Sequence, residues 1–451
     1  MKLTRVFAFM ALAGLTGSAF ATNGYFSHGY GMKAKGMAGV STTSTDDAFG
    51  GANNPAAMAF AGNRFDLGVD LFSPKREASR SGSAGFGGAM DPGRDFSAES
   101  DSDYFLVPEL GYTHQINSSL AAGVTVYGNG GMNTDYPGDA INSGVTGFCD
   151  ADGSGSPTAA DMGLFNGLCG KGSLGVDLMQ LIVAPTAAFK VAPNHSIGIS
   201  PLLGYQRFKA EGLQAFMGFS SAPDNLTNKG YDDAFGYGVR VGYLGKIIPT
   251  VTIGAAYASK MSFGEFDEYK GLFAEQGGFD IPENYNLGVA WQATPAVKLA
   301  LDYQRINYSG VASVSNPLLP NIMSAPLGAN QGAGFGWDDV DVWKIGVEHK
   351  FSPNFTLRAG YSHTDSPINA SDCATLSGDC SETSFNIIAP AVIEDHVTVG
   401  FTYTVASGNE LTMAYMHGFS NDVSGPGALL GGTEKIEMYQ DSLGIQYSWK
   451  M

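Results

Sequence analysis

Hydrophobic and polar residues alternate along most of the chain, from Arg64 to the C-terminus. In the stretch VTVGFTYTV, residues 397–405, every second residue is apolar and the residues between are Thr or Gly. The stretch FTLRAGYSH, residues 355–363, repeats this pattern and places Arg358 on the polar face. Successive side chains of a β-strand point to opposite faces of a sheet, so a period of two predicts strands with one apolar, aromatic-rich face. The sequence therefore predicts an all-β protein.

About fourteen such segments can be counted, an even number of the kind found in bacterial outer-membrane barrels. The predicted strands cover residues 64–74, 103–116, 119–134, 173–192, 195–212, 231–245, 250–263, 280–293, 296–309, 336–351, 354–364, 393–406, 409–419 and 436–449. Tight turns alternate strictly with seven long connections. The long connections cover residues 75–102, 135–172, 213–230, 264–279, 310–335, 365–392 and 420–435. Short turns at one end and long outer loops at the other are typical of a transmembrane antiparallel β-barrel, whereas a secreted soluble β-protein has no reason to alternate them.

The first 21 residues have the features of a cleaved secretory signal. Two basic residues precede an apolar run over residues 6–15, and the segment ends on small residues with Ala19 and Ala21 in an A-x-A arrangement. The apolar run is shorter than the roughly 20 residues that a membrane-spanning helix needs. The mature chain is therefore predicted to begin at Thr22.

Residues 22–63 do not alternate and mix glycines with Phe and Met, a composition suited to short helical turns packed inside another structure. A barrel of about fourteen strands is wider than its own side chains can fill. We therefore predict a small helical plug, or hatch, at 22–63, inside a transmembrane β-barrel formed by residues 64–451.

Composition and charge narrow the possible partners. The net charge is −18, with 43 acidic residues against 25 Lys and Arg, so nucleic acid is not an expected partner. The four cysteines fall into two close pairs, Cys149 with Cys169 and Cys373 with Cys380. An exported protein meets an oxidising compartment, which allows both pairs to form disulfides.

The triplet Asn54-Pro55-Ala56 closes an N-terminal segment that contains GMAG and DDAFGGANNPAAM, and the long strand series follows it. The stretch GGFDIPENYNLGVAWQ, residues 277–292, adds a similar strand entry. Together these features resemble the FadL/TodX family of outer-membrane transporters for long-chain fatty acids and aromatic hydrocarbons. The resemblance spans essentially the whole mature chain.

The resemblance implies a 14-stranded barrel with an N-terminal hatch in the bacterial outer membrane, and passive uptake of hydrophobic compounds without a cofactor. It also implies capture of the ligand among the outer loops and sideways release through a gap beside a kinked third strand. Within this frame, Pro55 fixes its own φ, and the Asn54 side chain can bridge backbone groups, so the corner can tie the hatch to the barrel wall. The alternative is an ordinary Asn-Pro turn.

The third predicted strand contains Gly128, Asn129, Gly130 and Gly131 in succession. Glycines within a strand mark a bulge or a close backbone approach, so this run is the candidate kink and wall opening. The alternative is a barrel corner without a gap.

Two outer loops carry large apolar residues that we expect to be exposed for ligand binding. Aromatic and Met side chains that are exposed to water usually form part of a binding surface. They are Leu213, Phe216, Met217 and Phe219 in one loop, and Phe266, Leu272, Phe273 and Phe279 in the other. The alternative is that the two loops only pack on each other as a lid.

Strand alternation directs the cations Arg240, Lys344 and Arg358 into the lumen, together with Asp302 and Glu348. The cations can hold a carboxylate head group of the cargo. Mutual pairing of these charges is the preferred interpretation, because barrel interiors are polar and carry such networks.

Candidates for a metal or catalytic site are weak. Asp150, Asp152 and Asp161 match part of a calcium loop, but Asp161 stands where a bidentate Glu is needed and Pro157 interrupts the loop, so no metal is expected. The sequence has no G-x-S-x-G motif and no His pair with zinc spacing, so we do not expect an enzyme.

A porin-type channel and an outer-membrane lipid hydrolase remain the alternatives, although an apolar hatch argues against an open channel. The expected partners of the chain, taken as a monomer, are hydrophobic small molecules, outer-membrane lipid, lipopolysaccharide and the barrel-assembly machinery.

Overall fold

The computed structural model describes residues 22–83, 94–143, 149, 163–319, 321–368, 382–427 and 431–451. The predicted signal peptide, residues 1–21, lies outside this part of the chain. Across these residues, none of the helices has the length and apolar character needed to cross a membrane.

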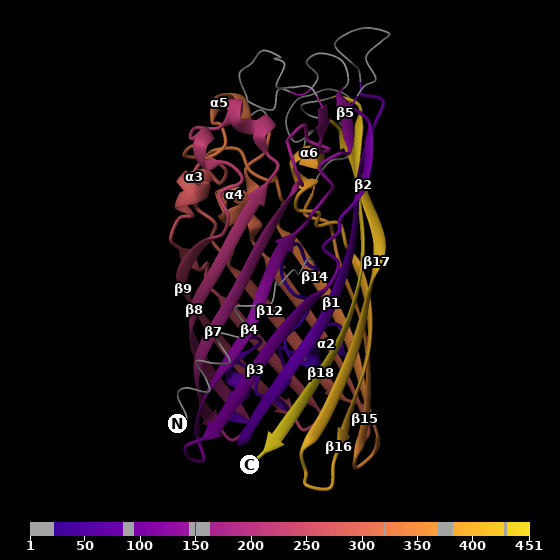
Figure 1. The fold of residues 1–451 in the computed structure, drawn as a ribbon. Helices are drawn as coiled ribbons and strands as arrows, with labels where there is room; N and C mark the ends of the chain where they lie inside the picture. The colour runs from indigo at the N-terminus through magenta and orange to yellow at the C-terminus, as the bar shows by residue number, and fades with distance from the viewer. Residues whose placement is uncertain are drawn as a thin grey trace.

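The main sheet is a closed antiparallel barrel (Figure 1). Of its sixteen strands, the short β2 and β11 pair only with β1 and β9, and the other fourteen form the wall, closed by pairing of β9 with β10. The wall strands are β1 Arg64–Ser81, β3 Phe105–Gln115, β4 Leu120–Asn133, β7 Gly175–Ala192, β8 His195–Glu211, β9 Asp232–Ile248, β10 Val251–Ala258, β12 Asn284–Gln292, β13 Val297–Ile306, β14 Val340–Ser352, β15 Phe355–Thr364, β16 Asp395–Thr404, β17 Glu410–Pro426 and β18 Thr433–Lys450. The predicted fold class is confirmed.

The wall is apolar outside and polar inside. On β14, Trp343 and Ile345 are 52% and 54% exposed on the outer face, whereas Lys344 and Glu348 are buried towards the lumen. A soluble β-protein buries its apolar face, but this barrel turns that face outward, as a wall in hydrocarbon must.

Three strands run further towards the long loops than the alternation of apolar residues predicts. β1, β17 and β18 continue several residues beyond the predicted ends at 74, 419 and 436, towards the end of the barrel that carries the long loops. Their extensions are polar and pair across strands, as Arg80 does with Glu434. These extensions lack the alternating apolar pattern because they lie beyond the apolar band of the wall, towards the long loops.

One end of the barrel, the loop end, carries most of the short helices and the small strands, and the C-terminus lies at the other end, the turn end (Figure 1). The loop-end elements are β2 Phe96–Glu99, β5 Ile141–Ser143, β6 Gly163–Phe165, η3 Gln214–Phe219, η4 Pro223–Asn225, β11 Ser262–Phe263, η5 Asp267–Tyr269, α3 Ala274–Gly277, η6 Tyr308–Gly310, α4 Ala312–Ser315, α5 Asn321–Ser324 and α6 Glu382–Asn386. Their apolar side chains form one large cluster that closes this end of the lumen.

Residues 22–63, called the hatch below, fill the lumen ahead of β1. The hatch contains α2 Met32–Lys35 and η1 Pro55–Ala59, and α2 is seen within the barrel in Figure 1. Most of the hatch residues are buried. Barrel side chains bond its backbone from several strands: Glu109 accepts from Gly31 N at 3.0 Å, Gln446 from Met32 N at 3.0 Å, and Thr398 from Ala38 N at 2.8 Å. These hydrogen bonds attach the hatch to three strands of the wall, β3, β18 and β16.

Candidate functional site

The Asn-Pro-Ala corner connects the hatch to the barrel wall. Asn54 caps η1, because its Oδ1 accepts a hydrogen bond from Ala56 N at 3.1 Å. Its Nδ2 donates to Thr42 O within the hatch at 2.8 Å and to Tyr243 O on β9 at 2.9 Å. Pro55 occupies the first helical position, where no N–H is needed. One buried side chain therefore joins a helix start, a hatch loop and the wall.

The third wall strand, β4, is bulged at the glycine run. Its register with β7 shifts between Gly128 and Gly130, which leaves Asn129 as the extra residue. On its other side, β4 pairs with β3 only as far as Val126 opposite Leu110. Beyond that pair, towards the loop end, β3 continues to pair with β1 and β4 continues to pair with β7. The wall therefore has a gap between β3 and β4 that begins beyond Val126 and includes the kink.

The first residues of the hatch occupy this gap. Ser27 N donates to Asn129 O at 3.1 Å, and Gly131 N donates to Tyr25 O at 3.2 Å, so residues 25–27 pair with β4 where β3 has left it. A Cβ at position 130 would lie 1.6 Å from Tyr25 O, so only glycine allows this approach. We call residues 22–28 the gate segment.

Two features of this arrangement were not predicted from the sequence. Pro108 lies in β3 just beyond the last β3–β4 pair, and a proline within a strand marks an edge because it has no N–H to donate. The partners of Tyr25 were not predicted: its buried ring lies 5.4 Å from Tyr308 and 5.9 Å from both Phe279 and Trp337, measured between ring centroids. Nothing in the local sequence around Tyr25 reveals these distant partners.

The gate segment lines two small cavities. One, of about 20 Å³, lies in the lumen, and Ser27 borders it together with Arg240 and Lys344. The other, of about 10 Å³, lies beside β1 and β4 and is bordered by Tyr25 and Met132. Each has room for about one water molecule at most, so the lumen is closed beside the gate segment, whereas a cavity of about 820 Å³ at the turn end is bordered by Lys33, Glu348 and Arg358.

The lumen-facing charges divide into two groups. Arg358 is neutralised by Glu348, with its Nη2 2.7 Å from Glu348 Oε2 and its Nε at 2.9 Å, as the preferred interpretation expected. Arg240 donates to Gly51 O at 3.1 Å, and Lys344 donates to Gln304 Oε1 at 2.8 Å. Within the described part of the chain, neither of these two buried cations forms an ion pair, so mutual pairing is wrong for Arg240 and Lys344.

Asp302 is buried and accepts hydrogen bonds from the hatch instead of pairing with a cation. Its Oδ2 accepts hydrogen bonds from Ser41 N, Thr42 N and Thr42 Oγ1, all at 2.8 Å. A carboxylate that accepts from several donors is a strong attachment point.

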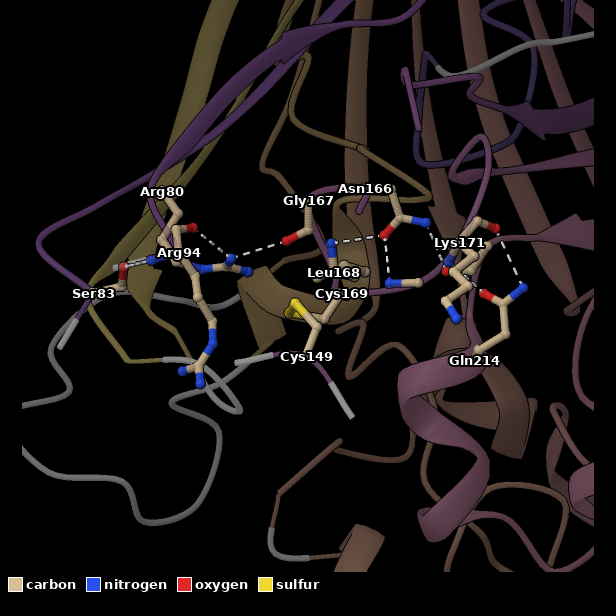
Figure 2. Close-up of a disulfide and its surroundings, with 12 residues drawn as sticks. Arg80, Ser83, Arg94, Cys149, Asn166, Gly167, Leu168, Cys169, Lys171 and Gln214 are labelled. Carbon is tan, nitrogen blue, oxygen red and sulfur yellow. Dashed lines mark hydrogen bonds between the residues drawn. A yellow bond between two sulfur atoms is a disulfide. The ribbon is translucent and has the colours of Figure 1, made fainter. Parts of the chain in front are cut away.

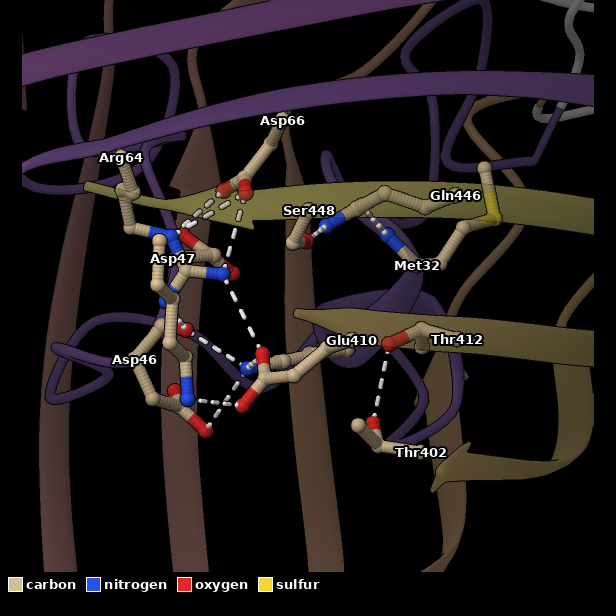
Figure 3. A network of polar contacts seen from close by, with 12 residues as sticks. Met32, Asp46, Asp47, Arg64, Asp66, Thr402, Glu410, Thr412, Gln446 and Ser448 are labelled. Atoms are coloured by element: carbon tan, nitrogen blue, oxygen red, sulfur yellow. Dashed lines mark hydrogen bonds and ion pairs between the residues drawn. The ribbon is translucent and has the colours of Figure 1, made fainter. Parts of the chain in front are cut away.

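An ion-pair network anchors the hatch near the turn end (Figure 3). Glu410 of β17 lies 2.8 Å from Lys33 Nζ in α2 and 3.3 Å from Arg64 Nη2 at the start of β1. Arg64 also pairs with Asp66 at 3.0 Å. Burial, followed by the neighbouring carboxylates, raises the pKa of Asp47 to about 6 in this part of the hatch. The network joins residues 29–63 of the hatch, called the hatch body below, to β1 and β17.

The expected exposure of the loop hydrophobics is wrong. Leu213, Phe216, Phe266, Leu272, Phe273 and Phe279 are all buried, and Met217 and Phe219 are partly buried against the same cluster. Phe273 packs 4.8 Å from Phe279, and Phe216 packs 5.6 Å from Phe385 in α6, between ring centroids. The loops bury this apolar surface against each other and against the gate segment, because exposing it to water costs free energy.

The first cysteine pair forms a disulfide that fastens an outer loop (Figure 2). The sulfur atoms of Cys149 and Cys169 are 2.01 Å apart, and both residues are buried. Beside it, Asn166 Oδ1 accepts from Leu168 N at 3.0 Å, and Arg80 Nη1 donates to Gly167 O at 2.9 Å. The second pair, Cys373 and Cys380, lies outside the described residues. So do the calcium candidates Asp150, Asp152 and Asp161.

Comparisons with known proteins agree with this architecture. A family model described as outer membrane protein transport protein (OMPP1/FadL/TodX) matches residues 168–424, more than half of the chain. The solved toluene transporter TodX of Pseudomonas putida is 19% identical, with a TM-score of 0.64 over 95% of this chain and 100% of that one.

Two further solved structures are similar. The toluene transporter TbuX of Ralstonia pickettii is 17% identical, with a TM-score of 0.59 over 94% of this chain and 99% of that one. A FadL homologue of Pseudomonas aeruginosa is 15% identical, with a TM-score of 0.62 over 96% and 99%. At these identities the structures establish the fold. A search of curated protein sequences gave no significant match.

Proposed function

The chain belongs to the outer membrane protein transport protein family (OMPP1/FadL/TodX), and from this membership we propose that it takes up small hydrophobic molecules passively and releases them sideways into the membrane. Relatives with solved structures are named as toluene transporters, and the proposed cargo here is of the same broad chemical kind. In an outer-membrane barrel the short turns face the periplasm and the long loops face outward.

The gap between β3 and β4 is the observation that carries the proposal. The β3–β4 ladder ends at Leu110 opposite Val126, and the gate segment pairs with β4 across the opening beyond. An apolar molecule that leaves through this gap enters hydrocarbon directly. It then avoids the polar mouth at the turn end, where Lys33 and Glu410 anchor the hatch.

Cargo can pass only if part of the structure moves, because the two cavities beside the gate segment are too small for it. The gate segment has the sequence TNGYFSH and no Asp, Glu, Lys or Arg. Asn23 is fully buried, and within the described structure neither its Oδ1 nor its Nδ2 has a hydrogen-bond partner. An unsatisfied buried group costs about 1–3 kcal/mol, which favours displacement of this segment. Its displacement joins the lumen cavity to the cavity beside β1 and β4.

The loop cluster serves in this proposal as a closed lid. Capture by the outer loops requires Phe216, Phe273 and their neighbours to separate, which exposes an apolar groove to the cargo. The hatch residues 22–63 and the barrel 64–451 act as separate functional units, one plug and one wall. The Asn54-Pro55-Ala56 corner holds the plug in place while its first residues move.

Arg240 and Lys344 are proposed to hold an anionic head group. Both are buried beside the lumen cavity, and Arg240 Nε has no hydrogen-bond partner among the described residues. A buried cation without a carboxylate is costly unless an anion reaches it. Arg358 has no such role in this proposal, because Glu348 already neutralises it.

Uptake by cells tests this proposal. Cells that express the protein should accumulate labelled hydrophobic compounds faster than cells that lack it. An Arg240→Gln/Lys344→Gln double variant should slow uptake of a long-chain fatty acid by about tenfold, equivalent to one lost charge-assisted contact, and leave toluene uptake unchanged. Lys298→Gln is the matched control, because that lumen cation is already paired with Glu348 at 3.3 Å. Equal loss for both cargos would contradict the head-group role.

The same experiments separate the rival classes. A porin would show steady ion conductance in planar bilayers, and a lipid hydrolase would turn over ester substrates. We expect neither, because the hatch fills the lumen and the proposed path is apolar. We also propose that the chain acts as a monomer after insertion by the barrel-assembly machinery, with its outer end among lipopolysaccharide, because a closed barrel leaves no sheet edge to pair.

A further inference from the structure

A ring of lysines surrounds the mouth of the lumen at the turn end, the end at which the C-terminus lies in Figure 1. Each lysine is among the last three residues of its wall strand at that end: Lys190 of β7, Lys246 of β9, Lys298 of β13, Lys350 of β14 and Lys450 of β18. The turns at this end, residues 116–119, 193–194, 249–250, 293–296, 353–354 and 405–409, contain no Asp or Glu. The chain as a whole has a net charge of −18, so this end differs in charge from the rest of the molecule.

The lysine side chains lie on the lumen side of the wall and not on its lipid side. Lys246 is opposite Thr252 in the β9–β10 ladder, and Thr252 borders the cavity of about 820 Å³ at the turn end. Lys350 borders the same cavity. Lys190 Nζ lies 4.9 Å from the centroid of the Phe60 ring in the hatch. Lipid headgroups around the outer face are therefore not the expected partners of this ring.

Only two of the five lysines form ion pairs within the described part of the chain. Lys298 Nζ lies 3.3 Å from Glu348 Oε1, and Lys450 Nζ lies 2.5 Å from Glu410 Oε1. These two carboxylates are only 4% and 7% exposed, so they offer little negative charge to the periplasm. The other three lysines have no carboxylate partner among the described residues and can receive an external anion.

The cavity at the turn end lies beside this ring, and three of the lysines border it. Its volume is in the range of ligand sites, and several threonine hydroxyl groups line it. Asp46 also borders the cavity, but its Oδ2 lies 3.7 Å from Lys33 Nζ and 3.5 Å from Arg358 Nη2, which offset its charge. The cavity therefore suits a polar, negatively charged group and not the apolar cargo.

The spacing of the lysines determines how large the bound anion must be. The strands β7 and β14 are nearly opposite each other, six strands apart in one direction around the barrel and eight in the other. With strands about 4.8 Å apart, opposite sides of a barrel of this size are separated by about 20 Å or more. One small anion cannot reach both sides, whereas an extended peptide of about seven residues can.

From these observations we infer that the lysine ring is a docking surface for an acidic segment of a soluble periplasmic protein. The turn end faces the periplasm, where such a segment can reach it. Its carboxylates pair with Lys190, Lys246 and Lys350 across the mouth, and one end of the segment enters the cavity. The negative net charge of the chain does not prevent this, because at physiological salt charges more than about 8 Å away are largely screened. The surface is separate from the gap beside β4, so cargo release does not depend on it.

Binding of a fluorescent decaglutamate peptide tests the inference, with the full chain in nanodiscs of phosphatidylcholine. We expect a Lys246→Gln/Lys350→Gln variant to bind the peptide about tenfold more weakly, because two exposed charge contacts are lost. Lys229→Gln/Lys270→Gln is the matched control: these lysines are exposed in loop-end connections, and the change in net charge is the same. The control should bind the peptide as the unaltered protein does. Equal weakening in the two variants would overturn the inference.

A second measurement uses the unaltered protein. Bound decaglutamate should protect Lys190, Lys246 and Lys350 from acetylation, measured by peptide mass spectrometry, and should leave Lys229 and Lys270 reactive. Free glutamate at the same carboxylate concentration should not protect them, because a single small anion cannot span the mouth. Protection by phosphatidylglycerol in the nanodisc alone would assign the ring to lipid headgroups. That result, or a lack of protection by the peptide, would overturn the inference.

Discussion

The two parts of the hatch lie in the same lumen but are held by different interactions. The hatch body, residues 29–63, is fixed by buried ion pairs and by side-chain caps, among them Lys33 with Glu410 and Lys35 with Asp70 at 2.7 Å. The gate segment, residues 22–28, has no ion pair among the described residues and is held by backbone hydrogen bonds to β4, by the packing of Tyr25, and by donors such as Tyr308 Oη to Asn23 O and Lys344 Nζ to His28 O. The difference indicates that a plug can be permanent and still have a movable edge.

Physical chemistry explains why the two kinds of contact suit these two roles. Removing one partner of a buried ion pair leaves an uncompensated charge, so the hatch body resists displacement strongly. The contacts of the gate segment cost less free energy to break. An apolar cargo can replace its aromatic contacts, and strands next to β4 can replace its backbone hydrogen bonds. The gate segment therefore belongs to the low-stability part of the molecule, from which moving elements are drawn.

The largest expected effect comes from locking the gate segment to the wall. In a Ser27→Cys/Asn129→Cys variant, oxidation should link the two positions, which the hydrogen bond between Ser27 N and Asn129 O places side by side. Uptake of hydrophobic cargo should fall by about tenfold or more, because the gate can no longer leave the gap. Uptake measured before and after reduction checks this, with the unaltered protein under the same reductant as a reference.

The matched control locks the hatch body instead. An Ala38→Cys/Thr398→Cys variant joins positions that already contact through the hydrogen bond from Ala38 N to Thr398 Oγ1. Oxidation should leave its uptake unchanged. If both links abolish uptake, the hatch moves as one unit; if neither does, cargo leaves by another route.

The second effect comes from removing the anchor of the hatch body. Glu410→Ala leaves Lys33 and Arg64 without their shared carboxylate and should lower the free energy of unfolding by about 3 kcal/mol. Equilibrium unfolding in urea, with the protein in lipid bilayers, measures the change. Glu437→Ala is the control: its pair with Lys435 is exposed, and its loss should be below about 1 kcal/mol. Similar losses in the two variants would show that the buried network is not the stronger anchor.

The smallest effect is expected at the corner of the hatch. Asn54→Ala removes the cap of η1 and leaves Thr42 O and Tyr243 O without this donor, so we expect a loss of about 2 kcal/mol. Asn53→Ala, in the same turn, removes one bond to Tyr30 O and should lose about 1 kcal/mol or less. Thermal unfolding of both variants measures the difference, and an inverted order would contradict the tie to the wall.

The sequence by itself determined the barrel. The period of two is a property of neighbouring residues, so it locates strands such as 355–364 without knowledge of their partners, and it directs Arg358 and Lys344 into the lumen. The bulge at Gly128–Gly131 could also be predicted, because glycine in a strand interior has a local meaning. The hatch boundary at Arg64 follows from the point where alternation begins.

Only the tertiary structure decided which of these residues meet. Phe216 is buried because Phe385, 169 residues away, packs against it, and Asp302 is engaged by Thr42 rather than by Lys344. Tyr25 packs against Phe279, Tyr308 and Trp337, which come from distant loops. Such contacts depend on how the barrel closes and on how its loops fold over one another. These contacts cannot be predicted from the periodicity or composition of one segment, because each partner comes from a segment far away in the chain.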